Sequence, residues 1–117
     1  MDFKIICSSL LVCSSTVLAQ PQALDINHEV KYAVSYCLSS AYPESQFSKD
    51  ASYVAGAYIQ KGSRGLHVYE SIRDFVDSYM NKKYISKHNK NLVIMQCLDL
   101  STSHKLEHLL QVSLKNG

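Results

Sequence analysis

The chain has 117 residues and a formal net charge of +2, from 12 lysines and arginines against 10 acidic residues. This length fits one domain, and so small a charge does not indicate a protein that binds nucleic acid. The positive charge is instead local: residues 82–90 contain four lysines, and no acidic residue lies between Asp77 and Asp99.

The N-terminus has the composition of a secretory signal peptide. Lys4 precedes an apolar run at 5–13, and a site suited to signal peptidase ends at Ala19. We expect cleavage after Ala19, which leaves an exported domain of residues 20–117. The apolar run is too short and too rich in serine to span a membrane, although a lipoprotein signal ending at Cys13 is an alternative.

Two cysteines, Cys37 and Cys97, remain after the signal is removed. In an oxidising compartment such a pair predicts one disulfide. Closing a loop of roughly 60 residues would contribute about 4 kcal/mol in the loop-entropy model. A free catalytic thiol is the alternative, but both cysteines lie in apolar helical patterns, which suits buried structural sulfur.

Apolar residues spaced by three and four predict the first two helices. The first is capped by Asp25 or Asn27 and ends near Tyr42, since proline follows. The second runs from an N-cap at Ser48 to Gly62. Gly56 costs stability inside a helix, so we expect another helix to approach closely there.

The rest of the chain also reads as helical, apart from one loop. A third helix is predicted at 65–83, a loop at 84–91, and a last helix at 101–115, capped by Ser101 or Ser103. Residues 92–100 predict a short buried helix; their β-branched residues would also allow a strand, but no partner strand is evident. The prediction is therefore an all-α domain, a small bundle of four to five short helices with one disulfide.

Residues 104–108 match the H-x-x-E-H pattern of zinc peptidases. On a helix, His104 and His108 would share a face, as metal ligation needs. No Asp, Glu, His or Cys follows to supply a third ligand, so a solvated helix face is favoured. A small zinc hydrolase using His104, Glu107 and His108 stays an alternative. No other catalytic or cofactor-binding motif is evident, so we predict no catalytic residue, metal or cofactor.

The basic loop is the best candidate for recognition, because helices hold its ends while its tip is polar. A plain solvated connection is the competing interpretation. Tyrosine is favoured at protein interfaces, and the chain has eight tyrosines and no tryptophan. The predicted binding residues are Tyr84, Ser86, Lys87, His88, Asn89, Lys90 and Asn91. Changing any of Lys87, His88, Asn89 or Lys90 should alter stability by no more than about 0.5 kcal/mol.

Four blocks in order, YAVSYCLSSAY, DASYVAGAYIQKG, KKYISK and MQCLDLSTSHKL, resemble the periplasmic immunity proteins of type VI secretion. The similar branch neutralises the fourth family of amidase effectors, and the likeness covers roughly residues 30–112. It implies an all-helical periplasmic homodimer without enzymatic activity, to which Gly56 and the many tyrosines also point.

The resemblance also implies a partner and a mechanism. The partner would be a papain-like Cys/His endopeptidase that cuts peptidoglycan stem peptides between D-glutamate and diaminopimelate, in a 2:2 complex. Inhibition would come from a loop inserted into the active-site cleft. Residues 84–91 are the first candidate for that loop and residues 61–65 the second. A general periplasmic adaptor remains an alternative; neither nucleic acid nor membrane is expected as a partner.

Overall fold

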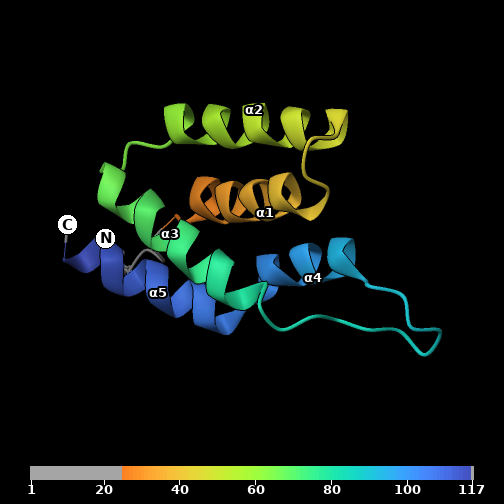
Figure 1. The fold of residues 1–117 in the computed structure, drawn as a ribbon. Helices are drawn as coiled ribbons and strands as arrows, with labels where there is room; N and C mark the ends of the chain where they lie inside the picture. The colour runs from red at the N-terminus through yellow and green to blue at the C-terminus, as the bar shows by residue number, and fades with distance from the viewer. Residues whose placement is uncertain (1–24, 117) are drawn as a thin grey trace, which may run out of the picture.

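The computed structural model describes residues 25–116. In that range the chain forms five α-helices, one short 3-10 turn and no regular β-strand (Figure 1). They are α1 (Asn27–Ala41), α2 (Gln46–Lys61), α3 (Leu66–Tyr79), α4 (Val93–Asp99), η1 (Leu100–Thr102) and α5 (His104–Lys115). The all-α prediction is confirmed. The predicted signal peptide, residues 1–19, lies outside the described residues.

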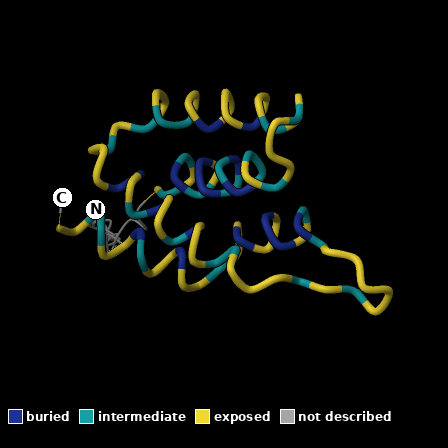
Figure 2. The backbone as a smooth tube through the Cα atoms, in the orientation of Figure 1, coloured by how far each residue is buried: buried dark blue, intermediate teal, exposed yellow. Residues whose placement is uncertain are grey.

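Helix α1 is the centre of the packing, with α2 on one side of it and α3, α4 and α5 on the other (Figure 1). Buried residues line the faces that these helices turn toward α1 (Figure 2). The most deeply buried include Ala33, Cys37, Ile72, Val76, Cys97, Leu100, Leu106 and Leu110. Helix α2 packs chiefly against α1, through Ala51 and Ala55, so one long side of it faces solvent.

The structure confirms the predicted cap at Ser103 and corrects the other two helix starts. The N-cap position of α1 is held by Ile26, which makes no side-chain cap bond. An Oδ1 atom of Asp25 accepts the amide of Asn27 at 3.0 Å, and Ser103 caps α5 by accepting the amide of Leu106 at 3.3 Å. The prediction of an N-cap at Ser48 is wrong. The turn after α1 places Ser45 there instead, and its side chain accepts the amide of Ser48 at 3.0 Å.

Helix α3 is shorter than predicted, since it ends at Tyr79 and the chain turns away through residues 80–83. The predicted helix at 101–115 is also divided. Its first residues belong to the 3-10 turn η1, and the α-helix begins only at His104, after the cap.

The predicted disulfide is confirmed. Cys37 of α1 and Cys97 of α4 are bonded, with Cα atoms 5.5 Å apart, and both residues are fully buried. The Sδ atom of Met80 lies 3.2 Å from the Sγ atom of Cys37. The disulfide therefore fixes α4 to the central helix close to the point where the chain leaves α3.

The two glycines of the second helical segment have opposite surroundings. A Cβ atom on Gly62 would overlap the hydroxyl of Tyr69, which is 1% exposed. A Cβ atom on Gly56 would have nothing within 4 Å. Within the described chain, the expectation of a helix packed closely on Gly56 is therefore wrong, because this residue lies on the side of α2 that faces away from α1.

We expect Gly62→Ala to lower the free energy of unfolding by about 1–3 kcal/mol, because the added methyl overpacks a site closed by Tyr69. Gly56→Ala is the matched control and should raise it by about 0.4–1 kcal/mol, since alanine favours the helix without a clash. Urea unfolding followed by circular dichroism measures both. Equal effects of the two changes would contradict the packing described at Gly62.

Candidate functional site: the hairpin loop

The segment 81–92, called here the hairpin loop, projects beyond α4 from the helical body (Figure 1). It connects α3 to α4. Residues 87–91 at its tip are all exposed, while Tyr84 and Ser86 are half-buried. The loop thus presents lysine, histidine and asparagine side chains to solvent, as the sequence predicted.

Backbone hydrogen bonds make this loop a hairpin. The amide of Leu92 donates to the carbonyl of Tyr84 at 2.8 Å, and the amide of Ser86 donates to the carbonyl of Lys90 at 2.8 Å. Between these two bonds, Ile85 pairs with Asn91 as an isolated antiparallel bridge. The two arms are therefore held together along their length.

Ser86 organises the tip. Its Oγ atom accepts the amides of His88 at 3.2 Å and Lys90 at 3.0 Å, and its carbonyl accepts the amide of Asn89 at 3.0 Å. A serine hydroxyl has two acceptor lone pairs, so both are used in shaping the turn. The sequence predicted Ser86 as a binding residue, and the structure places it as a support for its neighbours.

Asn89 has a φ of 58°, in the left-handed region that asparagine tolerates better than most residues. Alanine at this position would carry a strain of about 1–2 kcal/mol. This finding revises the expectation that Asn89→Ala has little effect on stability. The exposed residues Lys87, His88 and Lys90 have negative φ and carry no such strain.

The base of the hairpin loop is fixed by Gln96 of α4, which is 1% exposed. Its Nε2 atom donates to the carbonyl of Tyr79 at 3.1 Å and to the carbonyl of Lys82. A buried polar side chain is normally hydrogen-bonded, and here the bonds tie the start of the loop to α4. Gln96 was not among the residues predicted from the sequence; the signal there is a single amide within an apolar run.

Two tyrosine hydroxyls complete the base. Tyr79 donates to the carbonyl of Gln96 at 3.1 Å, and the hydroxyl of Tyr84 lies 3.1 Å from that of Tyr79. Because Tyr79 has one proton and gives it to Gln96, Tyr84 is the donor between the two rings. Burial and the bond with Tyr84 raise the pKa of Tyr79 above its ordinary value, so it stays neutral. Tyr84 thus braces one arm from the inside.

One exposed apolar residue of the loop was also missed. Ile85 is 55% exposed and lies on the first arm of the hairpin. Its side chain leaves apolar surface exposed beside the lysines and asparagines of the tip. In the sequence, Ile85 stands between Tyr84 and Ser86, and neighbouring residues of an extended arm point to opposite sides. The structure half-buries Tyr84 and Ser86, which leaves Ile85 on the exposed side.

The second candidate segment, residues 61–65, is tied down along the body. The Nε atom of Arg64 donates to Oε1 of Glu29 at 3.1 Å, and an Nη atom of Arg64 donates to the carbonyl of Asp25 at 3.2 Å. Glu29 is buried and Arg64 is partly exposed, so this turn is anchored to the body by a partly buried ion pair.

The H-x-x-E-H residues lie on the first turns of α5. His104, Glu107 and His108 are all exposed, and Nδ1 of His104 is 3.9 Å from Oε2 of Glu107. Within residues 25–116, no group of three or more His, Cys, Asp or Glu side chains is placed to hold a metal ion. The same part of the chain has no helix long and apolar enough to cross a membrane.

Comparison with known proteins gives the family. No curated protein matches the chain closely enough to be counted as a relative. The sequence model of the family Tai4, described as type VI secretion system amidase immunity protein, matches residues 30–110. This match begins within α1 and ends within α5, and it includes both bonded cysteines and the whole hairpin loop. The chain therefore belongs to the amidase immunity proteins of the type VI secretion system.

Proposed function

We propose that this protein inhibits its amidase effector by inserting the hairpin loop into the active-site cleft. The observation that carries the proposal is the preformed hairpin, whose tip residues 87–91 are exposed while its backbone is bonded internally. The effector, by the family resemblance, is a Cys/His endopeptidase of peptidoglycan. In this proposal the immunity protein catalyses nothing, needs no cofactor and acts in the periplasm.

Preorganisation favours this mode of inhibition. Ordering a flexible side chain at an interface costs about 0.5–1.5 kcal/mol, and ordering a free loop adds backbone entropy. The hydrogen bonds of Ser86 and Gln96 remove much of that cost before binding. A rigid, narrow hairpin also fits a protease cleft better than a flat helical surface does.

The charge of the loop suggests how the partners meet. Lys82, Lys83, Lys87 and Lys90 give the loop a positive field without an acidic residue to offset it. The charges at the exposed tip, Lys87 and Lys90, would mainly speed association with a negatively charged partner, and salt would screen them. We propose that the effector's cleft carries negative charge at its rim.

We propose that the homodimer expected for the family forms through the groove between α1 and α2. Two adjoining hollows of about 290 and 240 Å³ lie there and share Ser35 and Val54. Their walls are mainly apolar: Val30, Val34, Leu38, Phe47, Ala51, Val54 and Tyr58. Phe47 and Val54 are 44% and 45% exposed, which is unusual for side chains beside a core.

The dimer can be tested with two single changes on neighbouring residues. Val54→Glu puts a charge in the groove and should give a monomer in light scattering at micromolar concentration. Tyr53→Glu, on the outer side of α2 where Tyr53 is 77% exposed, should leave the dimer intact. A wild-type mass of one chain, or dimers in both variants, would contradict an interface in this groove.

The experiment for the main proposal uses the domain of residues 20–117 and the cognate amidase effector. Titrating the domain into a peptidoglycan hydrolysis assay should abolish cleavage at one immunity chain per effector, and the two should elute together from a sizing column. Hydrolysis that continues with a full complement of the domain would reject the inhibitory role.

A further inference from the structure

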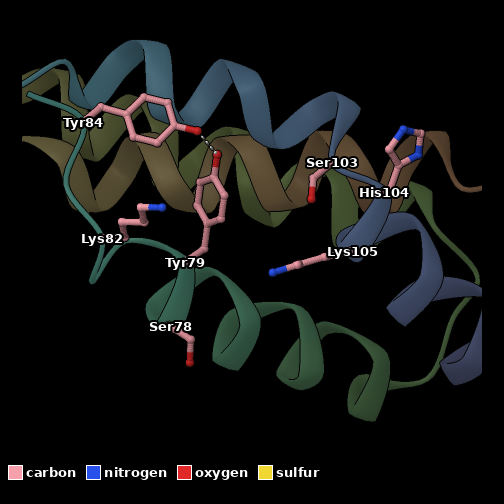
Figure 3. A pocket seen from close by; sticks show the side chains of 7 residues that line it. All are labelled: Ser78, Tyr79, Lys82, Tyr84, Ser103, His104 and Lys105. Carbon is pink, nitrogen blue, oxygen red and sulfur yellow. Dashed lines mark hydrogen bonds between the residues drawn. The ribbon is translucent and has the colours of Figure 1, made fainter. Parts of the chain in front are cut away.

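A hollow of about 550 Å³ lies between the base of the hairpin loop and the start of α5 (Figure 3). We call it the base pocket. It is lined by Ser78, Tyr79, Lys82, Tyr84, Ser103, His104 and Lys105. These residues come from α3, from the loop and from the cap of α5, so the pocket forms only when all three are assembled.

The base pocket is cationic. Lys82 and Lys105 enter its lining from different elements, and none of the lining residues is acidic. In Figure 3 the side chain of Lys105 reaches across the hollow toward Tyr79, and Lys82 lies on the other side of that ring. Among residues 25–116 neither lysine makes an ion pair.

Acidic side chains nearby do not neutralise the pocket. Glu107 lies at the rim, with its Oε2 atom 3.9 Å from Nδ1 of His104, and is not part of the lining. Asp99 is likewise outside the lining. Two ammonium groups thus face a hollow without an internal counter-charge, an arrangement that favours an anion from outside.

The uncharged residues of the lining indicate which kind of anion would fit the base pocket. The Oγ atom of Ser103 accepts the amide of Leu106, which leaves its own proton free to donate. Tyr79 gives its proton to Gln96 and Tyr84 gives its proton to Tyr79, so these two side chains contribute rings rather than donors. Aromatic walls with two ammonium groups suit a carboxylate on a short aliphatic stem, such as that of a glutamate.

We propose that the base pocket binds a carboxylate side chain of the effector, from an acidic residue on the rim of the cleft that receives the hairpin loop. This inference rests on the proposed function. Lys82 and Tyr84 belong both to the loop and to the pocket, so a cleft that closes around the loop as far as its base reaches the pocket. The contact would fix how deeply the hairpin enters.

The test is a double-mutant cycle in the hydrolysis assay. The double change Lys82→Gln with Lys105→Gln should weaken inhibition at least tenfold, mainly through faster dissociation of the complex. Because both residues are exposed, the variant should still fold. Lys49→Gln with Lys115→Gln removes the same charge from exposed positions elsewhere and should change inhibition less than twofold. Circular dichroism checks both variants.

The second step identifies the acid. Each Asp and Glu on the rim of the effector's cleft is changed to Ala and tested against the wild-type domain and the Lys82/Lys105 variant. One change should weaken binding to the wild type and have almost no further effect on the variant. If the wild type inhibits but no effector acid shows this coupling, the pocket proposal is overturned while the proposed function stands.

A further arm separates a free ligand from a side chain. Added N-acetylglutamate should compete with the effector's side chain and weaken inhibition by the wild type. It should not restore tight inhibition to the Lys82/Lys105 variant. These two results, together with the coupling, confirm the pocket as the carboxylate site. If N-acetylglutamate binds the pocket by NMR and no coupling exists, its ligand is a free acid and the proposal fails. A wild type that does not inhibit at all rejects the proposed function and, with it, this inference.

Discussion

Replacing residues 86–91 with a Gly/Ser linker of equal length should give a folded protein that no longer inhibits its effector. The linker removes the exposed tip and the Ser86 hydrogen bonds that shape it, but leaves Gln96, the disulfide and the helical core unchanged. Removing a central anchor of an interface costs about 2 kcal/mol or more of binding free energy. Titration calorimetry should therefore show binding to the effector weakened by at least about 2 kcal/mol relative to the wild type.

Point changes provide the controls for the linker. Lys87→Glu, His88→Ala and Lys90→Glu lie at exposed positions and should each alter stability by no more than about 0.5 kcal/mol. If a charge reversal only lowers the association rate, and added salt reduces the difference from the wild type, the lysine steers the approach of the effector. If it raises the dissociation rate instead, the lysine is desolvated in the cleft. A linker variant that still inhibits fully would move the inhibitory role to residues 61–65.

Removing the disulfide should have the second large effect. Cys37 and Cys97 are separated by 60 positions in sequence, and opening a loop of that size costs about 4 kcal/mol in the loop-entropy model. That is a large share of the roughly 5–15 kcal/mol stability of a small domain. The double change Cys37→Ala with Cys97→Ala should therefore unfold at a much lower urea concentration than the wild type.

The disulfide variant also tests how the loop is anchored. Without the bond, α4 is held to α1 by packing alone, and Gln96 of α4 no longer has a fixed position from which to hold Tyr79 and Lys82. Amide exchange in the hairpin loop should quicken even under conditions where the core stays folded. Oxidised and reduced wild type with the same urea midpoint would contradict the assigned role of the bond.

Much of the helical architecture could be predicted because it depends on local pattern. Apolar spacing located most of the helices, Pro43 marked the end of α1, and the expected export together with two remaining cysteines pointed to the bond between Cys37 and Cys97. The failures are also local in origin. Ser45 and Ser48 are both good caps, and only the turn geometry, with Glu44 at a φ of 67°, decides between them.

The exposed loop was predicted in position, but its internal hydrogen bonds were not. Polarity and lysine content marked residues 84–91 as an exposed loop. The pattern could not show that the hydroxyl of Ser86 accepts hydrogen bonds from the amides of His88 and Lys90. Nor could it show that Tyr84 turns inward to Tyr79. Such features depend on contacts between elements distant in sequence, as does the base pocket, where Lys82 and Lys105 come together.

Photo-crosslinking from the tip of the hairpin loop tests the central claim most directly. A photoreactive amino acid in place of His88 should crosslink to effector residues that line its active-site cleft, and mass spectrometry of the product would locate them. The same amino acid in place of Ser63, in the 61–65 turn that Arg64 ties to the body, should give no crosslink to the effector's active-site cleft. Crosslinks to the catalytic cleft from position 63 and none from position 88 would contradict insertion of the hairpin loop.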